Sequence, residues 1–231
     1  MKKNLVKYTL EFIVIVVGVS LSFYVEKINE ANYKENLKNQ SLKRILKNIE
    51  VDTDDFEFNS SALKEAIKSS EWIINNELKN LSRDSIGFHL NRALYYNTIF
   101  VDNQEEYRSL QNSGLIEIIE NEDLVVNLQK KYITHEFMKK IEEVIIKKSE
   151  KFDEFIYNNT KYKSFEVDEL GLPFDRTYNG NKVLPNYIIE MISDLMFYRN
   201  FYLGRIKNRT KSDSILISEI KSEIKLREIE K

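Results

Sequence analysis

The segment from Phe12 to Val25 constrains this chain most, because every residue in it is apolar or small. These residues alone would make a helix of roughly 21 Å, which is too short for a hydrocarbon core of about 30 Å. A helix that starts at Tyr8 reaches roughly 27 Å, and it places aromatic rings at both interfaces, Tyr8 at one and Phe23 and Tyr24 at the other. The pattern therefore predicts a transmembrane helix.

The polar and small residues of this segment share one direction. Four of them fall within roughly 60° of one another on a helical wheel: Lys7, Glu11, Gly18 and Ser22. Lys7 lies one turn before Glu11 and partly neutralises it, and Gly18 and Ser22 have the small-xxx-small spacing that lets two membrane helices approach closely. We interpret the stripe as a candidate partner face. The alternative is that Glu11 lies among the headgroups and that Gly and Ser are ordinary residues of a membrane helix.

A cleaved signal peptide is the main alternative to a membrane anchor. Lys2 and Lys3 form a basic start, and Ser20-Leu21-Ser22 offers a small-x-small cleavage site. The apolar character continues through Val25, which favours an uncleaved anchor. Cytoplasmic flanks of membrane helices usually carry the excess of Lys and Arg, but here lysines lie on both sides of the segment and do not decide its orientation. A long domain can, however, be translocated regardless of its charge. We therefore expect a bacterial inner-membrane protein with a cytoplasmic N-terminus and a periplasmic main domain.

The rest of the chain has the composition of a helical domain. Six Gly and two Pro in 231 residues leave little of the turn chemistry that an all-β or a doubly wound α/β fold needs. We predict an all-α fold in which the transmembrane helix continues into an antiparallel helical bundle. A formal net charge of -2 gives no reason to expect a nucleic-acid partner. The absence of Cys excludes disulfide scaffolds, thiolate zinc sites and Cys nucleophiles.

Apolar stripes at helical spacing divide the body into elements. The stripe within 42–49 predicts that the anchor helix continues to about Phe56, and Asn59-Ser60-Ser61 offers N-caps for a second helix. A third apolar stretch covers 86–100. We interpret the large aromatic residues of these stretches as core packing rather than as a ligand cage: Trp72, Tyr95, Tyr96 and Phe100.

Capping signals organise the middle of the chain. Asp102, with Glu105 three residues later, predicts the start of a short helix, which Gly114 ends because glycine adopts the left-handed conformation at no steric cost. Asn121 is expected to cap the longest helix of the body, whose buried seam includes Phe137.

The regular pattern lapses between Asn158 and Leu184, where Gly171-Leu172-Pro173 signals a turn. A last helical region begins near Pro185, and Gly204 is expected to kink or divide it. We therefore divide the chain into a membrane anchor (1–27), a helical bundle (28–157), an irregular loop (158–184) and a C-terminal helical region that packs on the bundle (185–231).

Residues that could support chemistry are scarce. His135-Glu136 begins like a zinc-protease motif, but Lys139 occupies the place of the second His. The acidic run from Asp52 to Asp55 lacks the central Gly and the final Glu of a calcium loop, so we interpret it as a solvated acidic turn. Phosphate-binding and nucleophile motifs are also missing. We predict no catalytic residue, no metal ligand and no cofactor.

Two parts of the chain carry a family resemblance. They are Glu11 to Ser20 with the Asn29-Glu30 that follows, and Tyr107 to Ile119 with Asn121 to Leu124 after it. In these parts the chain resembles an uncharacterised Bacteroidetes family of single-span membrane proteins with an N-terminal anchor and a helical extracytoplasmic domain. That family usually has a Trp where Ile28 stands here. The resemblance implies a membrane location and a helical fold, and it implies no activity.

These observations predict a membrane-anchored helical scaffold or accessory subunit that acts through protein contacts and not as an enzyme. Its expected partners are the lipid bilayer and either another membrane protein or a second copy of the chain. The alternative is a periplasmic ligand-sensing bundle that signals through a separate membrane transducer.

Overall fold

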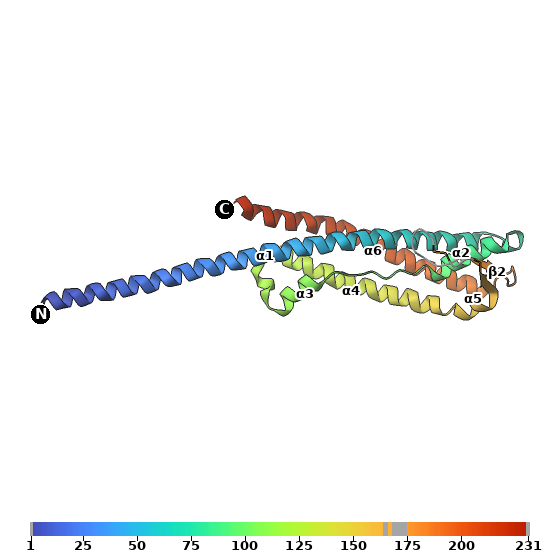
Figure 1. The fold of residues 1–231 in the computed structure, drawn as a ribbon. Helices are drawn as coiled ribbons and strands as arrows, with labels where there is room; N and C mark the ends of the chain where they lie inside the picture. Colours follow the sequence, from blue (N-terminus) through green and yellow to red (C-terminus); the bar gives the residue numbers. More distant parts are fainter. Residues whose placement is uncertain (1, 164–165, 168–174, 230–231) are drawn as a thin grey trace.

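The computed structural model of the chain describes residues 2–163, 166–167 and 175–229. Its elements follow in the order α1 (Lys2–Asn75), η1 (Leu78–Asn80), α2 (Arg83–Tyr95), α3 (Glu105–Asn112), η2 (Leu115–Ile118), α4 (Glu122–Glu150), α5 (Asp153–Asn159), β1 (Thr160–Tyr162), β2 (Arg176–Tyr178) and α6 (Asn186–Ile229). The predicted all-α class is confirmed, as is the long N-terminal helix that continues into an antiparallel bundle (Figure 1).

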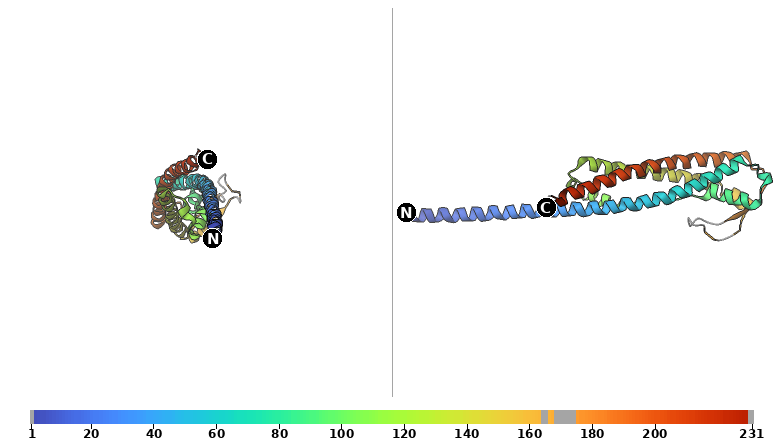
Figure 2. Two further views of the ribbon diagram at one scale, coloured as in Figure 1. Left: turned by 90° about the vertical axis from the view of Figure 1, so that its left-hand side faces the viewer. Right: turned by 90° about the horizontal axis from the view of Figure 1, so that it is seen from above.

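The molecule is an elongated rod in which α1 extends far beyond the rest of the chain (Figures 1 and 2). Helix α6 runs back along α1, so the C-terminus lies beside the middle part of α1 (Figure 1). Helix α4 runs in the same direction as α1 (Figure 1). Its first turns pack with 42–49 of α1 and with the end of α6 in one apolar cluster. A second apolar cluster fills the end of the bundle that lies far from the N-terminus.

The long helices of the bundle meet through a seven-residue repeat. Buried residues recur at alternating spacings of three and four, which is the pattern of a coiled-coil seam. On α1 they include Leu42, Ile45, Ile49, Asp52, Phe56, Asn59 and Leu63; on α4, Leu124, Leu128, Lys131, His135, Met138, Glu142 and Ile145; on α6, Leu195, Arg199, Tyr202, Ile206, Arg209, Asp213, Leu216 and Ile220. Each seam therefore carries polar residues at positions that normally hold aliphatic ones.

The predicted break after Phe56 is wrong, because α1 continues without interruption to Asn75. The expected N-caps bond within the same helix instead of ending it. Asn59 Nδ2 donates to Asp55 Oδ2 at 2.9 Å, and Ser61 Oγ donates to the Glu57 carbonyl at 3.1 Å. Burial of the repeat on both sides of these residues outweighs their weak preference for a helix start.

A nine-residue segment without helix, 96–104, replaces the helix expected up to Phe100; we call it the strap. Helix α2 ends at Tyr95, and the strap then runs back along the bundle to α3. Carboxylates of the neighbouring helices accept three of its backbone N–H groups, which therefore have partners outside any helix or sheet. Phe100 N donates to Glu142 at 2.9 Å, Val101 N to Asp55 at 3.1 Å and Asn103 N to Asp52 at 3.0 Å.

The capping predictions have mixed outcomes. Asn121 caps α4 by accepting from the Leu124 N–H at 3.1 Å, and Gly114 has the left-handed φ of 72° expected at a helix end. Asp102 does not cap α3, whose N-cap is Gln104, because the Asp102 carboxylate bonds to side chains of α4 instead. Phe137 is 44% exposed and lies outside the seam of α4.

The end of the bundle far from the N-terminus contains the small antiparallel pair β1 and β2, which lies within the segment expected to be irregular. The predicted turn at Gly171-Leu172-Pro173 lies outside the described residues. Helix α2 packs closely on β2 at Gly87, where an added Cβ would lie 1.9 Å from the Arg176 carbonyl oxygen. Helix α6 passes Gly204 without a break and, at 44 residues, is longer than the 29-residue α4 expected to be the longest.

Candidate functional site

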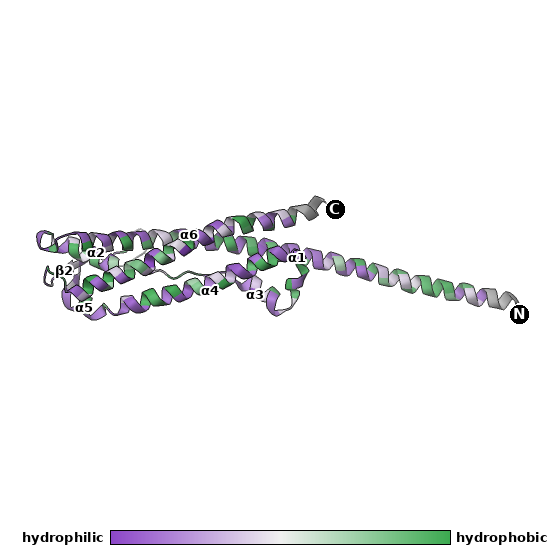
Figure 3. Cartoon of the chain, turned by 180° about the vertical axis from the view of Figure 1, so that it is seen from behind, coloured by the Kyte–Doolittle hydropathy of each residue, from purple (hydrophilic) through white to green (hydrophobic). Residues whose placement is uncertain are grey.

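The apolar segment of α1, coloured mostly green in Figure 3, extends beyond the bundle, and its side chains are exposed along its whole length. Within the described residues, α1 is the one helix that is long and apolar enough to cross a membrane, with a mean hydropathy of 1.9 in its best window and none of that window buried. Length and composition alone support this assignment.

The predicted partner face lies on this exposed segment. Lys7 Nζ and Glu11 Oε1 are 3.9 Å apart, so the two charges partly neutralise each other. Ser22 Oγ donates to the Gly18 carbonyl at 3.0 Å, which leaves no free hydroxyl donor on the helix surface there. A Cβ at Gly18 would meet no other atom within 4 Å, so the glycine is not required by packing within this chain.

The aromatic residues singled out in the sequence pack against different partners. Trp72 stacks on His89 with ring centroids 3.9 Å apart, and Phe100 stacks on Phe56 at 4.2 Å. Tyr95 donates its hydroxyl to Asp153 Oδ1 at 2.6 Å, and Tyr96 is 1% exposed. These contacts are those of core side chains.

The most unusual site is a buried cluster of charges at the centre of the bundle, which we call the central charge layer. Its members are Asp52 of α1, Asp102 of the strap, Lys131, His135 and Lys139 of α4, and Arg209 and Asp213 of α6. All except Lys139 and Arg209 have fully buried side chains. Three helices and the strap therefore meet at one level of the core that consists of charged and polar side chains.

Lys131 is the hub of this layer. Its ammonium Nζ lies 2.7 Å from Asp52 Oδ2, 3.1 Å from His135 Nε2 and 3.6 Å from Asp213 Oδ1. Asp213 is also 2.8 Å from Arg209 Nη2, at an angle that makes the contact an ion pair rather than a well-aligned hydrogen bond. Lys131 thus links a residue of α1 to a residue of α6.

The protonation state of His135 follows from its neighbours. An ammonium only donates, so His135 Nε2 must accept from Lys131 and the ring proton must be on Nδ1. That Nδ1–H donates to Asp102 Oδ1 at 2.8 Å. Burial lowers the pKa of His135 below its ordinary value, which keeps the ring neutral near neutral pH. Burial by itself would raise the pKa of Asp102, but hydrogen bonds from His135 and Lys139 lower it below the ordinary value.

With a neutral imidazole the layer has no net charge, because the carboxylates of Asp52, Asp102 and Asp213 balance the cations Lys131, Lys139 and Arg209. Balanced pairing is what makes burial of so many charges tolerable.

A metal ion is one alternative that the geometry raises. Ligand atoms of Asp52, Asp102 and His135 lie within 4.8 Å of one another. However, the Lys131 ammonium already contacts both Asp52 and His135, so an ion would have to displace a buried, paired cation. The donor set therefore fits an internal ammonium better than a metal.

Further polar contacts occur elsewhere along the seams. Glu142 of α4 accepts from the Tyr202 hydroxyl of α6 and from the strap, and burial raises the pKa of this carboxyl. Arg199 of α6 is fully buried and donates to the Ala93 carbonyl, near the end of α2, and to Asn97 Oδ1 of the strap at 3.0 Å. Burial lowers the pKa of Arg199 to about 9, and the negative end of the α2 dipole partly compensates its charge.

The interpretation of Asp52 as part of a solvated acidic turn is wrong, since its side chain is 0% exposed. A signal for the central charge layer is nevertheless present in the sequence. Asp52, Lys131, His135 and Asp213 all fall in the three-four register of the apolar residues around them. Asp102 carries no such signal, because the strap has no helical register.

Comparisons with protein-family models, with curated proteins and with solved structures find no match to this chain.

Proposed function

We propose that this chain is a single-span inner-membrane protein that acts as a scaffold or accessory subunit through protein contacts, without catalysis. In this proposal the first part of α1 spans the bilayer with its N-terminus in the cytoplasm, and the bundle stands in the periplasm. A membrane protein or a second copy of the chain binds the face formed by Lys7, Glu11, Gly18 and Ser22.

The observation that carries the proposal is the continuity of α1, which passes from the exposed apolar segment into the core of the bundle without a break. Lys38, the first residue of α1 whose side chain is described as buried, lies thirteen positions after Val25, which gives a helical stalk of about 20 Å. Because helix, stalk and bundle share one backbone, the bundle would be held at a fixed height and direction relative to the membrane.

The buried polar residues support a structural role. Polar groups in a coiled-coil seam disfavour alternative registers, because a shifted register would leave them unpaired. Lys131 finds its partners on α1 and α6 only when the three helices have the observed register. A rod of defined length and register suits a part that positions other proteins.

Membrane integration is tested first. The full-length chain, expressed in a bacterial host, should remain in the membrane pellet after washing with alkaline carbonate, and its mature N-terminus should precede the apolar segment. Protease added to spheroplasts should degrade the bundle. Release by carbonate, or a mature terminus at Phe23, would contradict the anchor; protection of the bundle would reverse the orientation.

The partner face is tested separately. Glu11→Leu and Gly18→Leu should each reduce co-purification of a membrane partner, or of a differently tagged second copy, from mildly solubilised membranes. Val16→Leu, on the opposite side of the helix, serves as the control. Equal recovery from all three variants would leave the stripe without a role.

The sensor alternative receives less support from the contacts. The rings considered for ligand binding already have protein partners, namely His89 for Trp72, Asp153 for Tyr95 and Phe56 for Phe100.

A further inference from the structure

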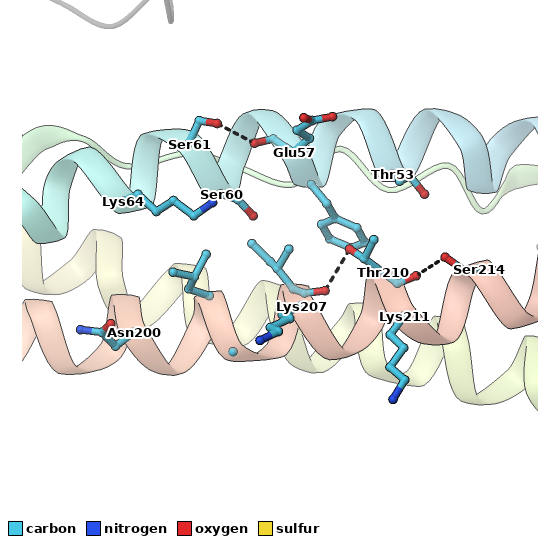
Figure 4. Close-up of a pocket in the computed structure, with 14 residues that line it drawn as sticks. Thr53, Glu57, Ser60, Ser61, Lys64, Asn200, Lys207, Thr210, Lys211 and Ser214 are labelled. Atoms are coloured by element: carbon cyan, nitrogen blue, oxygen red, sulfur yellow. Dashed lines mark hydrogen bonds between the residues drawn. The ribbon is translucent and has the colours of Figure 1, made fainter.

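A long groove lies between α1 and α6 in the part of the bundle that holds the central charge layer (Figure 4). Its volume is about 890 Å³, and it extends from Thr53 to Lys64 on α1, which is about 17 Å or three helical turns. Phe56 and Ile206, both nearly fully buried, form the bottom of the groove. A groove of this shape, with two helices as its walls, could receive one further helix in the manner of helix-in-groove recognition.

The walls of the groove offer mainly apolar contact, because four of their five hydroxyl groups are used as donors within their own helices. The hydroxyl groups of Thr53, Ser61, Thr210 and Ser214 each donate to the carbonyl one turn earlier in their own helix. Figure 4 shows the Ser61 and Ser214 bonds as dashed lines that stay within a single helix. Their donors are therefore already used, and the wall presents small side chains against which another helix can pack closely.

The rim of the groove is positively charged. Lys64 of α1 and Lys207 and Lys211 of α6 are exposed and form no ion pair with any residue in the described part of the chain, whereas Glu57 is the acidic residue of the lining. A ligand that covers the groove would bring its flanks close to these ammonium groups. Carboxylates on those flanks would gain favourable interactions and lysines would lose them.

We propose that this groove binds an acidic amphipathic helix of a partner protein, with an apolar stripe on the half-buried Leu203, above the bottom formed by Phe56 and Ile206, and carboxylates toward Lys64, Lys207 and Lys211. The inference rests on the proposed scaffold function and assigns a partner site in the bundle. A bilayer lipid is a poor occupant, because Thr53 lies 28 residues beyond Val25, or about 42 Å along the helix from the end of the apolar segment.

The test uses the full-length chain in lipid nanodiscs, because free detergent would compete for an apolar groove. The probes are fluorescent helical peptides of about four turns that share one Leu/Ala stripe and differ only in flanks of Glu, Gln or Lys. Binding is followed by fluorescence anisotropy. The wild-type chain should bind the Glu peptide most tightly and the Lys peptide most weakly, with about tenfold between them.

Two variants assign binding to the groove. Gly204→Leu places a side chain in the groove at a position where a Cβ meets no other atom within 4 Å, so the bundle keeps its fold while affinity for the Glu peptide falls by about tenfold or more. Replacement of Lys64, Lys207 and Lys211 by Glu should reverse the peptide order. Replacement of Lys140, Lys147 and Lys151, exposed on or just after α4, by Glu is the matched control and should leave the order unchanged.

Several outcomes would overturn the proposal. They are failure of the Glu peptide to bind, equal binding by Gly204→Leu, and an unchanged peptide order in the groove charge variant. Groove-dependent binding of a fluorescent long-chain fatty acid, but not of the Glu peptide, would make the occupant an amphiphile. Dimers in nanodiscs that Gly204→Leu dissociates would make it a second copy. Carbonate extraction tests the membrane anchor of the scaffold proposal independently. A negative result for the groove therefore does not contradict the anchor, and release by carbonate does not contradict the groove.

Discussion

Removal of the Lys131 ammonium is the sharpest test of the central charge layer. In Lys131→Met a side chain of similar length fills the same space, but Asp52 loses its ammonium partner at 2.7 Å and Asp213 loses the one at 3.6 Å. Asp52 then keeps only the N–H groups of Asn103, at 3.0 Å from the backbone and at 3.0 Å from the side chain. The layer changes from neutral to one uncompensated negative charge at a site with no exposure.

Breaking a buried ion pair by removing one partner costs about 3–5 kcal/mol. The whole free energy of unfolding of a typical domain is about 5–15 kcal/mol, so Lys131→Met should lose a large fraction of it. The change is measured by urea unfolding of the full-length chain in micelles, followed by helical circular dichroism and by fluorescence of Trp72, the single tryptophan. Lys140→Met, at an exposed position of α4, should shift the free energy by less than about 0.5 kcal/mol.

Neutralising the partner should restore much of this loss. Asp52→Asn keeps an oxygen for the Asn103 N–H groups and removes the unpaired charge, so the double variant should be more stable than Lys131→Met alone. Acid should also help Lys131→Met. Apart from burial, the charge of Lys131 is what lowers the pKa of His135, so in the variant this ring can take up a proton and replace the missing cation.

The reasoning would be refuted if Lys131→Met were as stable as the surface control. It would also be refuted if the double variant lost the sum of the two single losses, or if acid weakened Lys131→Met as much as the wild type. Any of these results would mean that the buried charges do not interact as the distances imply.

Three further perturbations have expected signs. Burial lowers the pKa of His135 below 6.5 in the folded state, so the unfolded state binds more protons at acid pH. The free energy of unfolding should therefore fall below about pH 6.5, by up to about 1.4 kcal/mol per pH unit. His135→Gln should flatten this slope, and an unchanged slope would mean that another group titrates. Asn121→Ala should cost about 1 kcal/mol in urea unfolding through loss of the α4 cap, and no cost would show that the cap is dispensable. Gly87→Ala should lower the melting temperature, because its Cβ would lie 1.9 Å from the Arg176 carbonyl, whereas Gly204→Ala, which meets open space, should not; equal effects would contradict the close packing of α2 on β2.

Local signals predicted the helices and several of their ends. The apolar segment, the stripe at 42–49 and the caps at Gly114 and Asn121 each depend on residues within a few positions of one another, and the structure has them where they were expected. The failures occurred where tertiary packing overrides a local preference. Asn59 and Ser61 have the chemistry of helix caps, yet their side chains bond back within α1 because the buried repeat continues past them.

The candidate sites divide in the same way. The membrane stripe at Lys7, Glu11, Gly18 and Ser22 depends only on helical periodicity, so it could be proposed from the sequence. The central charge layer could not, because hydrogen bonds between residues such as Asp52 and Lys131 join positions 79 apart in the chain. Register alone indicates that such residues point inward, but not which charges meet.

The sequence by itself determined that a long apolar helix leads into a helical body, because hydrophobic periodicity is a local property of the chain. Only the tertiary structure decided that α1 runs unbroken to Asn75, that the strap replaces the end of the helix expected over 86–100, and that Asp102 bonds to His135 instead of capping α3. Helix α1 continues because its buried repeat continues past the cap residues, whereas polar pairing explains the strap and Asp102. A buried carboxylate or N–H group must find a partner, and the partner that satisfies it is set by which helices lie side by side.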